Sequence, residues 1–205
     1  MIKAVLFDMD GVLIDAKDWH YEALNAALGL FGYEISRYDH LVTYDGLPTR
    51  EKLKMLSAER GLPVALHGFV NEMKQKYTVD YIFNRCKPTF HHEYALSRLK
   101  ADGMKIAVCS NSVRRSVELM IERSGLDVYC DLLLSNEDVA KSKPHPEMYQ
   151  KAMAAFGFEP TECLVVEDNE NGVAAARAAG AHVMVVGSVN DVTYEGVREH
   201  VRAAE

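Results

Sequence analysis

Two carboxylates stand two residues apart directly after the first apolar run of the chain. The run Ala4–Phe7 leads into Asp8, Asp10 and Gly11. A short apolar run that ends at turn-forming residues is typical of a buried strand, and alternate residues of an extended chain point the same way. Asp8 and Asp10 can therefore meet at the carboxyl end of a strand, where open α/β sheets bind their ligands. Neighbouring carboxylates repel each other unless a cation lies between them, so the pair predicts an oxygen-preferring divalent metal, Mg²⁺ before others.

A second apolar run, residues 105–109, ends in Ser110, Asn111 and Ser112, ahead of a predicted helix near residue 113. A serine hydroxyl and the free amides of a helix N-terminus can bind phosphate oxygens. An isolated serine at such a place is also a common helix cap. The residues alone leave both readings open.

Two further segments offer charged groups near predicted strand ends. Residues 141–146 read Lys-Ser-Lys-Pro-His-Pro, and a lysine fixed by prolines is a well-oriented cation that can offset charge on a phosphoryl group. Lys141 and Lys143 both fit that role. The run Leu164–Val166 ends in Glu167 and Asp168. Only one of these two adjacent acids can follow the strand face, so one should bind metal and the other support it.

Composition excludes several classes of function. The 205-residue chain is 48% hydrophobic, and its 23 basic and 30 acidic residues give a net charge of −7, which argues against nucleic acid or an anionic membrane surface as the main partner. Its four cysteines, Cys86, Cys109, Cys130 and Cys163, lack C-x-x-C spacing, so we expect buried free thiols. The chain shows neither a signal peptide nor an apolar run of membrane-spanning length, and we expect a cytoplasmic protein.

Strands and helices alternate in the second half of the chain, which is typical of βαβ units. Candidate strands are residues 3–8, 105–110, 131–135, 163–167 and 182–186, and candidate helices lie near 90–101, 113–123, 146–156 and 171–179. The region between about 15 and 85 is rich in helix formers and has no convincing strand. We predict an α/β protein in which a Rossmann-like parallel sheet core, residues 1–14 plus 86–205, receives a helical cap of residues 15–85.

These segments together resemble the four motifs of the haloacid dehalogenase-like (HAD) hydrolase superfamily, in order and across nearly the whole chain. They are Asp8-Met9-Asp10-Gly11-Val12, then Ser110 after its strand, then Lys143-Pro144-His145-Pro146, then Glu167-Asp168 with Gly172. The third motif's register favours Lys143 over Lys141. His145 occupies its variable position.

The resemblance implies a role for each motif residue. Asp8 would be the nucleophile that accepts the phosphoryl group, and Asp10 the general acid and base. Ser110 would contact phosphate, with Asn111 as a secondary contact, and Lys143 would offset charge. Asp8, Asp10 and Asp168 would bind Mg²⁺ directly, and Glu167 would support the site without direct contact or through a water molecule. Dehalogenases of the superfamily lack the second aspartate because a halide leaving group needs no acid. The presence of Asp10 therefore favours a phosphate ester as the substrate.

Within the superfamily the opening of the chain, Phe7 to Asp15, is similar to the β-phosphoglucomutase-like subgroup, including His20 five residues after Asp15. His20 would orient groups or shuttle protons at the hinge to the cap, although it could equally be an ordinary helix histidine. The segment 44–53 resembles the subgroup's substrate-specificity loop. Here Thr49 replaces the mutase's phosphate-gripping arginine, with Arg50 one position late as a candidate substrate contact, and Val113 replaces a lysine.

We therefore expect a Mg²⁺-dependent phosphatase that hydrolyses a small phosphorylated metabolite, such as a sugar phosphate, through an aspartyl-phosphate. A phosphosugar mutase is the alternative. Non-enzymatic alternatives are a receiver-like switch, whose phosphorylated aspartate would lie after a third strand, and an inert phosphate-binding relative. The expected partner is a small phosphorylated molecule, with no nucleic acid and no membrane, and we expect a monomer or weak homo-oligomer.

Overall fold

The computed structural model describes residues 1–204, and its internal contacts divide the chain into two compact units. One unit contains residues 1–15 and the chain from Cys86 onward. The other is the continuous segment Ala16–Arg85. Below we call them the core unit and the cap unit.

The core unit is built on a five-stranded parallel sheet with the order β3-β2-β1-β4-β5. The strands are β1 (Ala4–Phe7), β2 (Lys105–Cys109), β3 (Leu132–Leu134), β4 (Cys163–Glu167) and β5 (His182–Val185). The first strand of the chain lies in the middle, hydrogen-bonded on both sides, and all four of its residues are buried. A strand that is covered on both faces must be apolar throughout, which is why its sequence shows no alternation.

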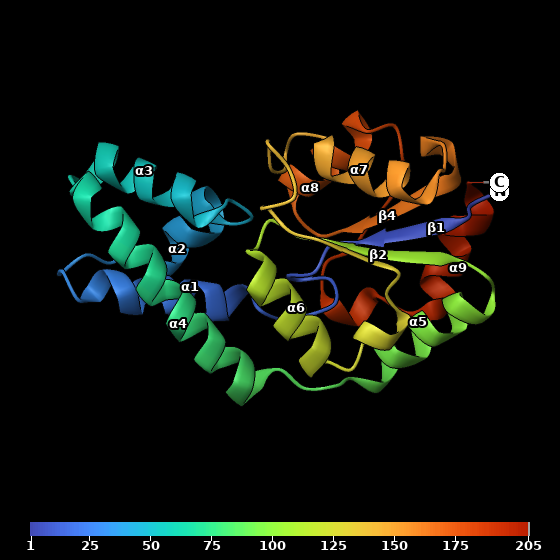
Figure 1. Cartoon of the computed structure of the whole chain (residues 1–205), viewed down its shortest axis with the longest axis horizontal. Helices are drawn as coiled ribbons and strands as arrows, with labels where there is room; N and C mark the ends of the chain where they lie inside the picture. The colour runs from blue at the N-terminus through green and yellow to red at the C-terminus, as the bar shows by residue number, and fades with distance from the viewer. Residues whose placement is uncertain (205) are drawn as a thin grey trace. The chain divides into compact units, whose positions relative to one another are not determined.

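Helices cover both faces of this sheet (Figure 1). They are α5 (Phe90–Ala101), α6 (Arg114–Arg123), α7 (Glu147–Phe156), α8 (Glu170–Ala178) and α9 (Tyr194–Ala203). In Figure 1, α7 and α8 lie on one face, and α5, α6 and α9 lie on the other. The first face is sealed by an apolar cluster that includes Leu6 of β1, Val165 of β4, Met148 of α7 and Ala175 of α8. This is the α/β, Rossmann-like core expected from the sequence.

The helix α9 has no counterpart among the predicted elements. It begins at a Thr193 cap, whose hydroxyl accepts from the Gly196 N–H at 3.1 Å, and it buries Val197 and Val201, one turn apart. Two apolar residues in a charged segment are a weak signal. Tertiary packing against α5 supplies the rest of the stability of this helix.

The cap unit is helical and contains no strand. Its elements are α1 (Lys17–Gly29), α2 (Arg37–Asp39), the π-helical turn η1 (His40–Tyr44), α3 (Thr49–Arg60), η2 (Val64–Leu66) and α4 (His67–Arg85). Helices α1 and α4 pack along each other. A separate apolar cluster, which includes Leu24, Leu28, Leu56 and Val70, gives this unit its own hydrophobic centre.

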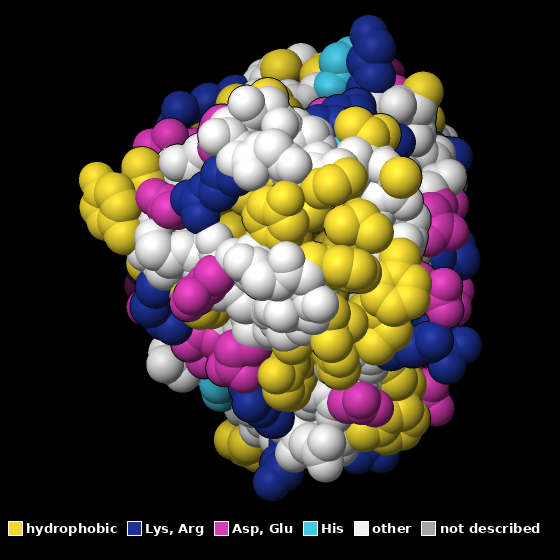
Figure 2. Space-filling view, turned by 90° about the vertical axis from the view of Figure 1, so that its left-hand side faces the viewer, with side chains coloured by type: hydrophobic (Ala, Val, Ile, Leu, Met, Phe, Trp, Pro, Cys, Tyr) yellow, Lys and Arg dark blue, Asp and Glu magenta, His cyan; other side chains and the backbone are white. Residues whose placement is uncertain are grey.

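The surface of the cap unit carries exposed apolar side chains among charged ones, and hydrophobic atoms gather on the face shown in Figure 2. The exposed apolar side chains of this unit include Leu30, Phe31, Val64 and Phe69, and the rings of Phe31 and Phe69 meet edge to face with centroids 5.6 Å apart. Across the described part of the chain, no helix combines the length and apolar character that crossing a membrane requires. The four cysteines are free thiols, as expected.

Candidate active site

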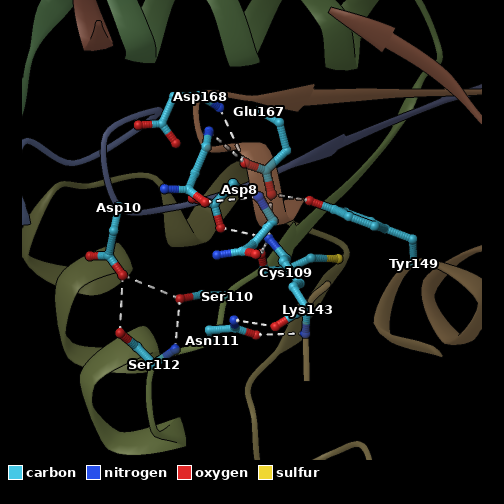
Figure 3. A network of polar contacts seen from close by, with 12 residues as sticks. Asp8, Asp10, Cys109, Ser110, Asn111, Ser112, Lys143, Tyr149, Glu167 and Asp168 are labelled. Carbon is cyan, nitrogen blue, oxygen red and sulfur yellow. Dashed lines mark hydrogen bonds and ion pairs between the residues drawn. The ribbon is translucent and has the colours of Figure 1, made fainter. Parts of the chain in front are cut away.

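The parallel strands bring the predicted site residues to one edge of the sheet. Phe7 of β1 is in register with Val108 of β2 and Val166 of β4, so the next residues of the three strands lie side by side. The backbone N–H of Asp8 donates to the carbonyl of Val166 at 2.9 Å, which continues the ladder by one residue. Asp8 and Glu167 therefore emerge next to each other (Figure 3).

Lys143 is the centre of a buried network at this edge. Its Nζ donates to Asp8 Oδ1, to the Cys109 carbonyl and to Glu167 Oε1, each at 2.7 Å, and the residue is only 4% exposed. Burial alone would lower the pKa of Lys143, but the charges of Asp8 and Glu167 outweigh it and raise that pKa above its usual value. The lysine is therefore a fixed cation, and its three N–H bonds are all used.

Asn111 holds the backbone of Lys143 in place. Its Oδ1 accepts from the Lys143 N–H at 3.1 Å, and its Nδ2 donates to the Lys143 carbonyl at 3.2 Å. The sequence predicts Asn111 as a secondary phosphate contact. In the structure this amide binds the loop that presents the lysine, so we assign it a positioning role.

Glu167 is buried and accepts hydrogen bonds on both oxygens. Oε1 accepts from the Tyr149 hydroxyl at 2.6 Å in addition to Lys143, and Oε2 accepts from the N–H groups of Asp168 and Asn169 at 3.1 and 3.4 Å. Tyr149 lies on the buried face of α7, and its ring lies 4.8 Å from Lys143 Nζ. This tyrosine was not among the predicted site residues.

Gly172 makes room for the Glu167 carboxyl group. A Cβ built on Gly172 would lie 1.8 Å from Glu167 Oε1 and 2.0 Å from Cδ, far closer than non-bonded atoms can approach. The glycine of the fourth motif is therefore required by a close approach of a side chain to α8. The sequence shows the glycine but does not reveal which group lies against it.

Three carboxylates come together at this place and could hold a metal ion. One oxygen each from Asp8, Glu167 and Asp168 lies within 4.8 Å of the others, and both Asp168 oxygens are buried. Burial, and then the negative charge of Glu167, raises the pKa of Asp8 well above its usual value. An all-oxygen, anionic donor set of this kind fits a hard divalent cation such as Mg²⁺, whose charge would relieve the repulsion.

The Asp10 carboxyl group is not part of this carboxylate cluster. The clustered carboxyl oxygens belong to Asp8, Glu167 and Asp168, while Asp10 Oδ2 accepts from the Ser112 hydroxyl at 3.0 Å and the Ser110 hydroxyl at 3.4 Å. The physical reason is the backbone after β1. The strand ends at Phe7 and the backbone bends at Met9, between the two aspartates, so they do not lie on one extended segment.

The hydroxyls of Ser110 and Ser112 both face Asp10 (Figure 3). The Ser112 N–H donates to Ser110 Oγ at 3.0 Å, and both hydroxyls reach the same carboxyl oxygen. The sequence singles out Ser110 alone. Ser112 could have been found from its i, i+2 spacing, because alternate residues at a strand end point the same way.

The two predicted cap residues differ in their surroundings. His20 is partly buried on α1, with Nδ1 3.2 Å from Lys74 Nζ on α4. Arg50 is an exposed residue at the start of α3, with its side chain 64% exposed and its Nε 3.4 Å from Glu51 Oε1. Both belong to the cap unit.

The chemistry available at the sheet edge is specific. The Asp8 carboxyl group is held by an ammonium group, and that of Asp10 is held by two hydroxyls. Asp168 joins Asp8 and Glu167 in a cluster suited to a divalent cation. Such a set provides a nucleophile, a proton donor and positive charge in one place. These are the requirements of phosphoryl transfer through a covalent intermediate.

Comparison with known proteins agrees with this arrangement. A family model described as haloacid dehalogenase-like hydrolase matches residues 5–186. The chain is 29% identical over 195 residues to a phosphorylated carbohydrates phosphatase of Thermotoga maritima, covering 93% of this chain and 88% of that protein. It is 30% identical over 197 residues to a probable pseudouridine-5'-phosphatase of Saccharomyces cerevisiae, covering 90% and 82%.

Among solved structures, a β-phosphoglucomutase from Clostridium difficile has the same fold. The TM-score is 0.84 at 23% identity, and the match covers 99% of this chain and 98% of that one. Because the family model spans most of the chain and includes all four motifs, the protein belongs to the haloacid dehalogenase-like hydrolase family.

Proposed function

We propose that this protein is a Mg²⁺-dependent phosphatase that hydrolyses a small phosphorylated metabolite, such as a sugar phosphate, through an aspartyl-phosphate on Asp8. The observation that carries the proposal is the meeting of Asp8, Asp10, Ser110, Lys143 and Asp168 at one sheet edge. The two curated relatives are phosphatases of phosphorylated compounds, and the chain is accordingly a phosphoric monoester hydrolase.

The first half of the reaction uses the two aspartates in different roles. A carboxylate oxygen of Asp8 forms a bond to phosphorus while the bond from phosphorus to the leaving oxygen breaks. Asp10 gives its proton to that oxygen, so the leaving group departs as an alcohol. The hydroxyls of Ser110 and Ser112, which bind Asp10 here, are donors for phosphoryl oxygens when Asp10 turns to the leaving group.

The second half restores the enzyme. Asp10, now ionised, takes a proton from water as the water oxygen bonds to phosphorus, and the bond between phosphorus and Asp8 breaks. Inorganic phosphate leaves and Asp8 is again a carboxylate. Lys143 keeps Asp8 oriented and offsets negative charge throughout. Mg²⁺ held by Asp8 and Asp168, with Glu167 nearby, would supply positive charge to the phosphoryl oxygens.

The roles of the two aspartates are testable with p-nitrophenyl phosphate and Mg²⁺. We expect Asp8→Asn to abolish phosphate release, because the amide is not a nucleophile. Asp10→Asn should reduce the rate by about 10²–10⁴, as is usual when a general acid and base is lost. During turnover by Asp10→Asn, intact-mass spectrometry should detect a protein species heavier by one phosphoryl group.

The matched control is Asp127→Asn, which removes the same charge from an exposed place on the core unit and should retain full activity. If Asp8→Asn keeps more than a few per cent of the wild-type rate, Asp8 is not the nucleophile. Stable phosphorylation of the wild type without release of phosphate would instead support a receiver-like switch.

Hydrolysis and phosphosugar isomerisation can be separated in one assay. The protein is incubated with β-glucose 1-phosphate and a trace of the 1,6-bisphosphate, and glucose 6-phosphate and free phosphate are measured separately. We expect phosphate release with little glucose 6-phosphate, because Thr49 and Val113 stand where the mutase has cationic residues. Rapid glucose 6-phosphate formation with little free phosphate would overturn the phosphatase proposal.

A further inference from the structure

The segment of residues 111–112 links strand β2 to helix α6 and belongs to neither. Its side chains nevertheless hold two groups of the site. The Asn111 amide binds the backbone of Lys143, and the Ser112 hydroxyl donates to Asp10 Oδ2 at 3.0 Å. A loop outside regular structure moves easily unless its backbone and side chains are held, so the contacts that fix this segment matter for both groups.

Asn136, two residues after β3, binds two neighbouring carbonyl groups of this segment. Its backbone N–H donates to the Ser112 carbonyl at 3.0 Å, and its side-chain Nδ2 donates to the Asn111 carbonyl at 2.9 Å. Hydrogen bonds are directional, so two of them from one residue to successive carbonyls fix both the position and the direction of the chain there. Asn136 therefore connects the end of β3 to the loop that follows β2.

Asn136 is itself presented by a turn that is held at several points. The Asp138 carboxylate accepts from the Ser135 N–H at 2.8 Å and from the Ser135 hydroxyl at 2.7 Å. The Asp138 N–H donates back to the Ser135 carbonyl at 3.2 Å, and Arg114 of α6 pairs with the Asp138 carboxylate. The turn is thus a fixed base from which the Asn136 side chain reaches the neighbouring loop.

The contacts continue from Asn111 to the proposed nucleophile (Figure 3). Asn111 Oδ1 accepts from the Lys143 N–H at 3.1 Å, and Asn111 Nδ2 donates to the Lys143 carbonyl at 3.2 Å. The Lys143 ammonium group then donates to Asp8 Oδ1 at 2.7 Å. A continuous series of contacts therefore runs from Asn136 through Asn111 and Lys143 to Asp8.

We propose that Asn136 is a positioning residue for Lys143 and that its side chain acts through Asn111. This role rests on the proposed phosphatase function, in which Lys143 orients Asp8 and offsets negative charge. Without the Nδ2 donor, the Asn111 carbonyl loses a fixed partner, and the amide that holds the Lys143 backbone moves with it. Catalytic groups must be held within about 0.5 Å of their productive geometry, so the loss should reach the reacting centre.

The side chain and the backbone of Asn136 hold different parts of the loop. A substitution at this position removes the Nδ2 bond to the Asn111 carbonyl and keeps the backbone bond to the Ser112 carbonyl. Ser112, and with it Asp10, should therefore be affected less than Lys143. Side-chain variants of Asn136 thus test the route through Asn111.

Kinetics provide the first test. Asn136→Ala removes the donor, and Asn136→Leu removes it while keeping a branched side chain of similar size. We expect each variant to lower kcat for p-nitrophenyl phosphate with Mg²⁺ by about three- to tenfold, the factor that one ordinary hydrogen bond contributes. KM should change little, because Asn136 acts on the loop and not on the substrate.

The matched control is Asn84→Ala in the cap unit. Asn84 Nδ2 donates to the Asp80 carbonyl at 2.8 Å, so this variant loses one hydrogen bond of the same kind and should keep the wild-type kcat. An unchanged kcat in both Asn136 variants, or a change in KM alone, would overturn the proposal.

A double-mutant cycle tests the route. If Asn136 acts through the Asn111 amide, Asn136→Ala should lower kcat by less than about twofold once Asn111→Ala is present, because the hold on the Lys143 backbone is already lost. Equal effects of Asn136→Ala with and without Asn111→Ala would overturn the route through Asn111.

Amide hydrogen exchange, measured by NMR for single residues, gives a readout that does not depend on turnover. The Lys143 N–H donates to Asn111 Oδ1, so we expect it to exchange about three- to tenfold faster in Asn136→Ala than in the wild type. The Ile106 N–H, which donates to Asp131 Oδ2 at 2.8 Å in the same unit, should exchange at the wild-type rate. If the Lys143 amide is unchanged, or if both amides exchange faster to the same extent, Asn136 does not position the lysine.

A wild-type protein that releases no phosphate from any substrate would contradict the proposed function alone. The exchange rate of the Lys143 N–H would still decide whether Asn136 positions this lysine, because it measures the hold on the backbone and not turnover.

Discussion

At the scale of single residues, the position of Asp8 depends on how Lys143 and the side chains around it are held. Asn111 fixes its backbone, while Asp8, Glu167 and the Cys109 carbonyl fix its ammonium group. Glu167 is in turn fixed by Tyr149. A buried charged group costs free energy unless all its neighbours are in place, so changes two contacts away from Asp8 should be felt at Asp8.

Tyr149→Phe tests this connection. The substitution removes one hydroxyl that donates to Glu167 Oε1 and keeps the ring beside Lys143. We expect kcat to fall about tenfold, because a hydrogen bond to a charged group is lost, while KM for p-nitrophenyl phosphate changes little. Steady-state kinetics and a thermal melt are the measurements.

Tyr194→Phe is the matched control, since its hydroxyl donates to a carboxylate, Asp102, at 2.9 Å elsewhere on the core unit. It should leave kcat unchanged. A Tyr149→Phe protein with a lower melting temperature and an unchanged kcat would show that Tyr149 only stabilises the fold.

The sequence singled out residues whose chemical type differs from that of their neighbours. It missed residues, such as Tyr149, that matter through a hydrogen bond to a distant side chain. Asp8, Ser110 and Asp168 follow strands directly, where apolar patterning stops, and Lys143 stands out beside a proline in the loop before α7. Tyr149 lies on an ordinary buried helix face, and a core tyrosine looks the same whether or not its hydroxyl meets a carboxylate. Such contacts depend on packing between distant elements, which one-dimensional patterns do not contain.

At the scale of elements, strands and helices of the core unit were predictable because their patterns are strong. The five predicted strands correspond to β1–β5, with ends that differ by at most one residue. Helix α7 ends at Phe156, as expected for the predicted helix 146–156, and Gly157 after it adopts φ +69°. Helix α9 was missed because only Val197 and Val201 mark its buried face.

Asp131 shows how a single side chain positions one element against others. Its Oδ2 accepts from the Ile106 N–H of β2 at 2.8 Å and from Lys100 of α5 at 2.7 Å, and its Oδ1 accepts from Lys105 at 3.0 Å. Burial alone would raise the pKa of Asp131, but the bonds from Lys100, Ile106 and Lys105 outweigh it and lower the pKa to about 2. The residue thus anchors the beginning of β3.

We expect Asp131→Asn to lower the melting temperature at pH 7, and the difference from wild type to disappear on acidification. The folded-state pKa lies below the unfolded value of about 4, so this stabilisation is present above pH 4 and is lost as the pH falls toward 2. Thermal melts from pH 7 to pH 2 measure it. A difference that stays constant over that range would refute the ionic origin, and Asp127→Asn should show no such difference.

At the scale of the whole molecule, the carboxylate cluster and the helical insertion belong to different units. Each unit has its own apolar centre, and the chain passes between them only at residues 15–16 and 85–86. The sequence indicated the helical insertion from its composition. It could not show that Lys52 is buried and Lys54 exposed, because these two lysines of α3 differ only in how the folded cap unit packs around them.

Folding brings the carboxylates of Asp8, Glu167 and Asp168 together, and the unfolded chain has no such cation site. We expect Mg²⁺ to raise the melting temperature and EDTA to abolish activity. A ligand that binds only the folded state stabilises it by about 2.7 kcal/mol at one hundred times its Kd. Differential scanning fluorimetry across millimolar Mg²⁺ is the measurement.

Asp168→Asn should lose this response to Mg²⁺, whereas the surface variant Asp127→Asn should keep it. A wild-type melting temperature that is independent of Mg²⁺, together with full activity after exhaustive chelation, would contradict the metal assignment.

The three hydrogen bonds of Lys143 also determine which lysines of this protein react with reagents that modify amines. Acylating reagents react only with an uncharged amine whose nitrogen lone pair is accessible, and Lys143 is buried, charged and fully engaged. Lys3, Lys54 and Lys76 carry side chains that are 49–66% exposed. The protein can therefore be coupled to a support through its surface amines while the ammonium group beside Asp8 remains unmodified.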